Sequence, residues 1–219
     1  MIKYCIFDLD GTLLDTLGSI RYYLNRTLSS HGYREVTKEE CKSFIGDGAR
    51  MLVTRALKVS GEEDSEAIER VLRKYNAAYD SDPYYLTEAY PGIVDALSEL
   101  SSHGVTLAVL SNKPDSTAVQ VVTRFFGNSF STVRGGREGV PLKPDPRAAL
   151  DMIEAMGAGE SEVAFIGDTA VDIETGRRAR VGLTLGVSWG FRDRAELISL
   201  GADAIADTAE DLTRIIIGG

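Results

Sequence analysis

Short apolar segments recur along this chain, and helical patterns separate them. The segments lie at 2–7, 106–110, 163–166, 184–187 and, more weakly, 204–206. Each is short and bounded by turn or polar residues, as a buried strand would be. Strands that alternate with helices predict a parallel sheet covered on both faces, which is the doubly wound arrangement of an α/β domain.

One stretch, residues 16–85, breaks this alternation. It contains no convincing strand, and its apolar residues recur at helical spacing. Thr37, followed by Glu40 three residues later, has the pattern of a capping box at the start of a helix. We therefore expect a helical domain at 16–85, inserted into an α/β core that is formed by 1–15 and 86–219.

The composition narrows the classes of protein that fit this pattern. The chain has 219 residues, 43% of them apolar, and a formal net charge of −9. That length suits one sizeable core with an inserted domain, and the apolar share is too high for a disordered chain. The acidic balance disfavours a nucleic-acid-binding protein, because a polyanion is bound by a basic surface.

The sequence also disfavours a membrane or secreted protein. The longest uninterrupted apolar run has four residues, whereas a membrane-spanning helix needs ~20. The chain begins with a strand-like segment, Met1–Asp8, so no secretory signal is expected. Cys5 and Cys41 do not make a disulfide framework and are interpreted as reduced thiols. We therefore expect a cytoplasmic protein.

The most informative local feature is Asp8-Leu9-Asp10-Gly11-Thr12, directly after the first predicted strand. Two carboxylates two residues apart at a strand end repel each other, and a divalent cation shared with a third carboxylate would relieve that repulsion. Oxygen ligands favour Mg²⁺. Gly11 permits a tight exit from the strand and leaves backbone N–H groups for an anion. An aspartate-rich turn without a ligand is the alternative that this segment alone leaves open.

A second acidic pair follows the predicted strand at 163–166. Asp168 supplies the third carboxylate, and Asp172 lies four residues later, one turn into a predicted helix, where it can face the same edge. The alternative is that Thr169 or Asp168 caps this helix. Capping is compatible with metal binding, and it would not explain the second aspartate.

Two further polar groups occur at predicted strand ends or in the loops after them. Ser111-Asn112-Lys113 follows the strand at 106–110, where a hydroxyl and an amide can hold phosphate oxygens. Lys143 precedes Pro144 in a loop and could be a fixed counter-charge for a phosphate and a nucleophile. Taken alone, each fits an ordinary turn or a solvated loop equally well.

Together these groups occur in the order DxDGT, Ser, Lys-Pro, GDxxxD. In this order the chain resembles the haloacid dehalogenase superfamily of phosphohydrolases over its whole length. The resemblance implies a Rossmann-like core and identifies the helical insert with the superfamily's small cap domain. Segments 44–48, 90–92 and 187–191 are similar to the phosphoglycolate phosphatase subgroup. Relatives that cleave pyrophosphate, nucleoside monophosphates or other sugar phosphates share most of these segments.

The resemblance implies a role for each matching residue. Asp8 is the expected nucleophile, which forms an aspartyl-phosphate, and Asp10 is the expected acid for the leaving alcohol and base for the water. Mg²⁺ is expected on the Asp8 and Asp168 carboxylates and the Asp10 carbonyl. Asp172 is expected to act through water or to orient these ligands. The residues expected to bind the phosphoryl group are Gly11, Thr12, Ser111, Asn112 and Lys143.

The helical insert is expected to close over the edge of the sheet, exclude water and recognise the leaving group. Our candidates for a substrate-facing loop are Gly46, Asp47, Gly48 and Arg50, where Arg50 would offset a second anionic group of a small acid substrate. The alternative is a solvated helix start, with Asp47 as its N-terminal charge.

The preferred function is a Mg²⁺-dependent phosphatase for a small phosphorylated metabolite, phosphoglycolate first, in a monomer or homodimer. A mutase similar to β-phosphoglucomutase, a pyrophosphatase and a nucleotidase on the same fold remain open. A non-catalytic binding module is disfavoured, because Asp8, Asp10, Lys143 and Asp168 are all intact. A phosphonatase would need a Schiff-base lysine in the insert, and none there lies in a recognisable motif.

Three other patterns are interpreted as structural. Gly186–Gly190 fits the G-x-S-x-G elbow of serine hydrolases, but that mechanism needs a histidine after the serine, and His31 and His103 both precede it. Each histidine stands before a glycine, which is typical of a helix C-terminus. Gly135-Gly136 is interpreted as a turn.

Overall fold

The computed structural model describes residues 1–218 and divides into two compact units. One unit combines residues 1–15 with the chain from Ala89 onward, and the other comprises Thr16–Glu88. Each is described by itself. Two short strands, β2 (Leu14–Asp15) and β3 (Glu88–Ala89), pair where the chain passes between the units.

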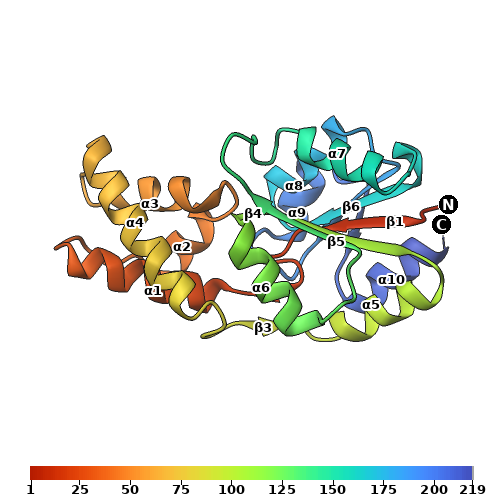
Figure 1. Ribbon diagram of the computed structural model, residues 1–219, viewed down its shortest axis with the longest axis horizontal. Coiled ribbons are helices and arrows are strands. Elements are labelled where there is room, and N and C mark those ends of the chain that lie inside the picture. The colour runs from red at the N-terminus through yellow and green to blue at the C-terminus, as the bar shows by residue number, and fades with distance from the viewer. Residues whose placement is uncertain (219) are drawn as a thin grey trace. The chain divides into compact units, whose positions relative to one another are not determined.

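The first unit is built on a six-stranded sheet with the order β5-β4-β1-β6-β7-β8. All of its neighbouring strands pair in parallel (Figure 1). The chain builds outward from β1 through β4 to β5, and then returns to place β6 on the other side of β1. This reversal makes the carboxyl ends of β1 and β6 a topological switch point, where α/β sheets bind their ligands. The strands are β1 (Tyr4–Phe7), β4 (Thr106–Pro114), β5 (Thr132–Gly136), β6 (Val163–Gly167), β7 (Leu183–Val187) and β8 (Ala204–Ala206).

Helices cover both faces of the sheet, which confirms the predicted doubly wound fold (Figure 1). Helices α5 (Ile93–Ser102), α6 (Asp115–Phe126) and α10 (Ala209–Gly218) pack on one face, around Phe7 and Leu107. Helix α7 (Arg147–Ala155) packs on the other, against Ile6 and Phe165. The alternation of side chains along β1 accounts for this, because Ile6 and Phe7 point to opposite faces. Two further helices and a short 3₁₀ turn complete the unit: α8 (Ala170–Arg178), α9 (Arg194–Ser199) and η1 (Glu160–Glu162).

The prediction for 135–136 was wrong, and it concealed a strand. Gly135 and Gly136 are not a turn but the last two residues of β5, at the edge of the sheet. A Cβ at Gly135 would lie 2.5 Å from the Lys113 carbonyl oxygen, so the end of β4 can approach this closely only because residue 135 has no side chain. β4 also runs four residues beyond its predicted end at Leu110. The polar segment Ser111–Lys113 therefore belongs to the strand.

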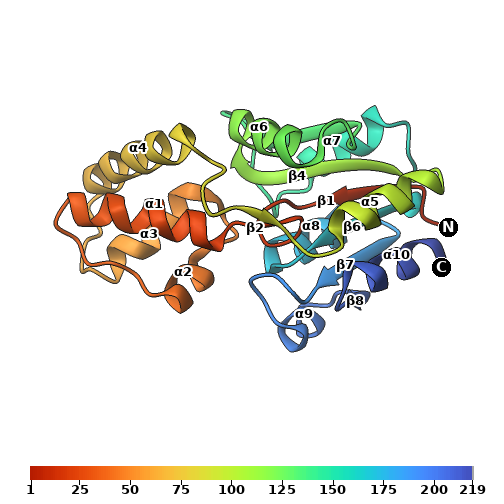
Figure 2. The ribbon, with the colours of Figure 1, turned by 90° about the horizontal axis from the view of Figure 1, so that it is seen from below.

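The second unit is helical, as the sequence predicted (Figure 2). Thr37 and Glu40 form the predicted capping box, with Thr37 Oγ1 accepting from the Glu40 N–H and Glu40 Oε2 accepting from the Thr37 N–H. Buried Asn25 ties the first helix to the loop before the second through two hydrogen bonds with Val36. The helices are α1 (Leu17–Ser30), α2 (Lys38–Phe44), α3 (Gly48–Lys58) and α4 (Ser65–Ser81).

Candidate active site

Three parallel strands end in the predicted site residues. Asp8 follows β1, Asp168 follows β6 on one side of it, and Ser111 lies near the end of β4 on the other. The carboxyl ends of parallel strands meet at one edge of a sheet, so these side chains converge at the switch point.

Three carboxylates form a buried cluster there. Asp8, Asp168 and Asp172 each offer an oxygen, and these oxygens lie within 4.8 Å of one another. Burial raises the pKa of Asp8 to about 7, helped by the charge of Asp172 and opposed by Lys143. Burial and the charges of Asp172 and Asp8 also hold the pKa of Asp168 well above its usual value. The cluster is therefore short of positive charge.

Lys143 lies between two members of this cluster. Its Nζ donates to Asp172 Oδ1 at 2.6 Å and lies 2.8 Å from Asp8 Oδ1, and its side chain is 2% exposed. Burial alone would lower the pKa of Lys143, but the two carboxylates outweigh it and raise that pKa above its usual value. The predicted counter-charge for Asp8 is therefore a fixed ammonium group and not a solvated surface lysine.

Asp172 has a second task at the start of α8. Its Oδ2 accepts hydrogen bonds from the N–H and the hydroxyl of Thr169, at 3.0 and 2.7 Å. This arrangement fixes the carboxylate so that Oδ1 faces Lys143. Helix capping and the carboxylate cluster thus share one residue, as the sequence allowed.

Asn112 has a partner that the sequence did not indicate. Its side-chain amide donates to the Lys143 carbonyl at 3.0 Å, and its Oδ1 accepts from the Lys143 N–H at 2.9 Å. This pair of bonds holds the loop that carries Lys143 against β4. The structure therefore shows Asn112 supporting Lys143, and a phosphate contact by Asn112 stays a prediction.

Gly11 and Thr12 differ from prediction in the same way. Their N–H groups donate to the carbonyls of Leu14 and Leu9, so these amides are not left for an anion. The Thr12 hydroxyl donates to Asp168 Oδ1 at 2.8 Å. Gly11 has a φ of +90°, and a Cβ there would lie 2.3 Å from Asp168 Oδ2. Both residues support Asp168, and a phosphate contact by either of them stays a prediction.

The segment after β7 also supports the site. The Phe191 N–H donates to Asp168 Oδ2 at 2.7 Å, and the Trp189 indole N–H donates to the Thr12 carbonyl at 3.0 Å. A Cβ at Gly190 would lie 2.3 Å from the Gly11 carbonyl oxygen. The sequence singled this segment out only as a subgroup similarity, and its contacts give it a physical role.

Lys113 is a buried charged side chain of the site to which the sequence analysis gave no role. Its Nζ donates to both carboxylate oxygens of Asp10, at 2.9 and 3.1 Å, and its side chain is 5% exposed. The sequence contained a signal for this contact. Ser111 and Lys113 are two residues apart near the end of β4, and Asp8 and Asp10 are two residues apart directly after the neighbouring strand β1. Such pairs share a face in extended chain.

The residues present fit a divalent cation. Among the described residues, the site brings four carboxyl groups together with two ammonium groups, so that two negative charges would be left in a buried place with all four carboxyl groups ionised. A divalent ion would neutralise that excess, and an all-oxygen donor set suits Mg²⁺. The acidic members are Asp8, Asp10, Asp168 and Asp172, and the basic members are Lys113 and Lys143.

The predicted specificity residues have partners within the helical unit. Arg50 forms an ion pair with Glu69, and Arg55 Nη2 lies 2.5 Å from Asp47 Oδ2. Asp47 is the first residue before α3, but its side chain makes no capping hydrogen bond. A substrate-facing role for Gly46, Asp47, Gly48 and Arg50 stays a prediction.

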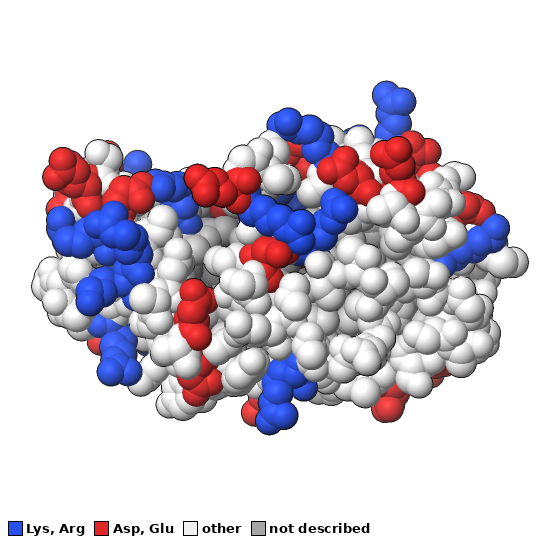
Figure 3. Space-filling view, viewed as in Figure 1, with Lys and Arg blue, Asp and Glu red and all other residues white. Residues whose placement is uncertain are grey.

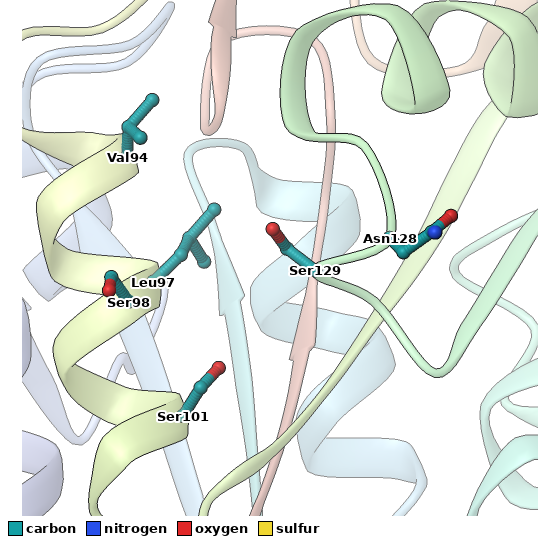
Figure 4. A pocket seen from close by; sticks show the side chains of 6 residues that line it. All are labelled: Val94, Leu97, Ser98, Ser101, Asn128 and Ser129. Carbon is teal, nitrogen blue, oxygen red and sulfur yellow. The ribbon is translucent and has the colours of Figure 1, made fainter.

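The remaining patterns have structural explanations. His31 and His103 end α1 and α5, and each ring nitrogen Nδ1 lies within 3.0 Å of a carbonyl oxygen of its own helix. Ser188 of the G-x-S-x-G sequence donates to Asp207, so it has an acidic partner and not a histidine. A cavity of about 540 Å³ beside α5 has no acidic or basic lining residue (Figure 4). It is lined by Val94, Leu97, Ser98, Ser101, Asn128 and Ser129.

The geometry defines a class: an α/β domain with buried aspartates and two buried lysines at its switch point. Residues 5–185 match the family described as haloacid dehalogenase-like hydrolase. The chain belongs to the haloacid dehalogenase-like hydrolase family, as its motifs indicated. In the described part of the chain, no helix has the length and apolar character needed to cross a bilayer.

Within this family, the chain is similar to proteins that are named phosphatases. Phosphoglycolate phosphatase 1 of Pseudomonas aeruginosa is 34% identical over 94% of this chain and 78% of its own length. Phosphoglycolate phosphatase of Agrobacterium fabrum is 33% identical over 95% of this chain and 89% of its own. A crystal structure from Lactobacillus delbrueckii subsp. bulgaricus matches with a TM-score of 0.94 and 32% identity, over 99% of both chains. The family and these named relatives identify the chain as a phosphatase.

Proposed function

We propose that this phosphatase is Mg²⁺-dependent and hydrolyses a small phosphate monoester, phosphoglycolate first, through a phosphorylated Asp8. The observation that carries the proposal is the position of the Asp8 carboxylate. It lies at the switch point, in contact with the ammonium group of Lys143 and beside two further buried carboxylates.

The residues of the chain divide the first half of the reaction. Asp8 attacks phosphorus, and its new bond forms as the bond from phosphorus to the leaving oxygen breaks. Asp10, in its protonated form, gives its proton to that oxygen. Lys143 offsets negative charge at Asp8 throughout, because its Nζ is held in place by Asp172.

In the second half, Asp10 takes a proton from water as the water oxygen bonds to phosphorus. The Asp8–phosphorus bond breaks, which releases inorganic phosphate and restores both carboxyl groups. Asp8, Asp168 and the Asp10 carbonyl would hold Mg²⁺, with Asp172 orienting the set. Bound there, the ion would neutralise the phosphoryl oxygens and the excess charge of the aspartates.

The named relatives, which are phosphoglycolate phosphatases, support phosphoglycolate as the first substrate to test. The helical unit would recognise the second anionic group of such a substrate, and Arg50 remains our candidate. A cytoplasmic enzyme is consistent with two buried free thiols, Cys5 and Cys41.

The test is release of inorganic phosphate from phosphoglycolate and from p-nitrophenyl phosphate, with Mg²⁺ present. We expect hydrolysis of both, and a higher kcat/KM on phosphoglycolate. A wild-type protein that releases phosphate from neither would contradict the proposal. Hydrolysis of the aryl ester alone would keep the chemistry and remove phosphoglycolate as the substrate.

A further inference from the structure

The strongest unassigned contact in the site joins Lys113 to Asp10. The ammonium group lies within hydrogen-bond distance of both carboxylate oxygens, and Lys113 is buried. Among the described residues, Lys113 is the one side chain within hydrogen-bond distance of the Asp10 carboxylate. Each carboxylate oxygen has two lone pairs, so the contact leaves one on each for a substrate or water.

The local fold explains why Lys113 faces Asp10. The pairing of β4 with β5 shifts register between Leu110 and Pro114, and such irregularities re-aim side chains at functional sites. Within this stretch the Ser111 hydroxyl accepts from the Lys113 N–H at 3.2 Å. This irregular end of β4 fits against β5 because Gly135 has no side chain that would collide with the Lys113 carbonyl oxygen.

The two buried lysines of the site therefore have separate partners. Lys143 contacts Asp8 and Asp172, whereas Lys113 contacts Asp10. Each of the two aspartates proposed to do chemistry thus has its own ammonium group. A lysine that served mainly to bind phosphate would have no need of a two-oxygen contact with Asp10.

We propose that Lys113 is a positioning residue for Asp10: it orients the carboxyl group and offsets the negative charge that develops when Asp10 gives its proton to the leaving oxygen. The inference rests on the proposed function. In the step concerned, the O–H bond of Asp10 breaks, and its proton joins the oxygen that departs from phosphorus. The electron pair left on Asp10 then faces the Lys113 ammonium.

This role has a signature that a direct phosphate contact would lack. An alkoxide leaving group needs a proton as it departs, whereas p-nitrophenolate is stable enough to leave without one. Loss of Lys113 should therefore slow phosphoryl transfer from an alkyl ester and largely spare transfer from the aryl ester. A lost phosphate contact would slow both, because the phosphoryl group is the same.

The experiment compares kcat/KM of wild type and Lys113→Met on phosphoglycolate and p-nitrophenyl phosphate. This constant reports the first irreversible step, the transfer to Asp8. We expect a loss of about 30- to 100-fold on the alkyl ester and of about threefold or less on the aryl ester, with the alkyl loss mainly in kcat. Lys113→Arg, which keeps the charge, should recover part of the alkyl-ester activity.

Two further variants sharpen the result. In an Asp10→Asn background, Lys113→Met should cost little more, because its partner is already gone. Lys143→Met is the matched control, a buried lysine in contact with Asp8, and should slow both esters alike. If Lys113→Met does not fold, Lys113→Gln makes the same comparison, since its amide reaches Asp10 without the charge.

The role of Lys113 would be overturned if Lys113→Met lowered kcat/KM equally on the two esters. It would also be overturned if Lys113→Met lowered kcat/KM in the Asp10→Asn background by the same factor as in wild type. Neither outcome would contradict the proposed function, which is tested separately by phosphate release from the wild-type protein and by the Asp8 variant.

Discussion

The ion pairs at the aspartate site of the α/β unit are buried, whereas the ion pairs of the helical unit, like those elsewhere on the α/β unit, are at least partly exposed. In the α/β unit, the side chains of Lys143 and Asp172 are 2% and 1% exposed. In the helical unit, the side chains of Arg50 and Glu69 are 58% and 42% exposed, and charged groups of both signs interleave on the face shown in Figure 3. Buried pairs are costly to break, because one charge is left desolvated, whereas exposed pairs contribute little and exchange partners easily. We therefore expect substitutions at the buried pairs of the aspartate site to have larger effects than substitutions at the exposed pairs of the helical unit.

The largest effect expected from the α/β unit is at the nucleophile. Asp8→Asn should reduce phosphate release to less than about 1% of wild type, because the amide has nearly the same shape but is not nucleophilic. Circular dichroism and thermal melting should show a folded protein. Substantial residual turnover in the purified variant would remove Asp8 from its assigned role.

Metal removal should have a comparable effect. Activity should vanish with EDTA and return with Mg²⁺ more than with Zn²⁺, because the candidate ligands are all oxygens. Thermal melting gives a second readout, since an ion that fills the carboxylate cluster should raise the melting temperature. Full activity after exhaustive chelation, or a tightly bound zinc ion, would count against this donor set.

An intermediate effect on stability and activity is expected at Asn112, which holds the loop that carries Lys143. Asn112→Ala removes both hydrogen bonds to the Lys143 backbone and leaves two buried polar groups unpaired. We expect a loss of about 1–3 kcal/mol in the free energy of unfolding, with reduced kcat. Urea denaturation measures it, and Asn128→Ala, at an exposed asparagine, is the matched control. Equal stability of the two variants would show that the clamp is dispensable.

The smallest effect on stability, and a selective effect on activity, are expected in the helical unit. Arg50→Ala should change the free energy of unfolding by about 1 kcal/mol or less, because its ion pair is exposed. Its kcat/KM on phosphoglycolate should fall roughly ten- to a hundredfold, while p-nitrophenyl phosphate is spared. Arg73→Ala, an exposed arginine of α4, is the control. Equal losses on both substrates would withdraw Arg50 as a specificity residue.

The sequence could predict the residues at strand ends and the hydrogen bonds between neighbours in the chain. Asp8, Asp10 and Asp168 were predictable because each lies at the end of an apolar strand, and strand ends of a parallel sheet meet at one edge. The capping box of Thr37 and Glu40 was predictable because its bonds are local.

Hydrogen bonds made by the residues that support the site, over long sequence separations, were not predictable. Asn112 finds Lys143 31 residues away, and Thr12 finds Asp168 156 residues away. Lys113 reaches Asp10 only because the end of β4 is irregular, which in turn requires a glycine on β5. Strand β5 itself escaped detection because it contains Arg134 and ends in two glycines, so it lacks the apolar character of its neighbours.

The central claim is that Asp8 becomes phosphorylated, and an acid-quenched sample tests it most directly. Asp10→Asn should accumulate the intermediate with p-nitrophenyl phosphate, since an aryl ester can phosphorylate Asp8 but the variant lacks the base that activates water. Mass spectrometry of the quenched protein should find one phosphoryl group on the peptide that contains Asp8, and none once Asp8→Asn is added. A phosphoryl group on another residue, such as Ser111, or p-nitrophenol release in a single turnover with no protein adduct, would contradict the account.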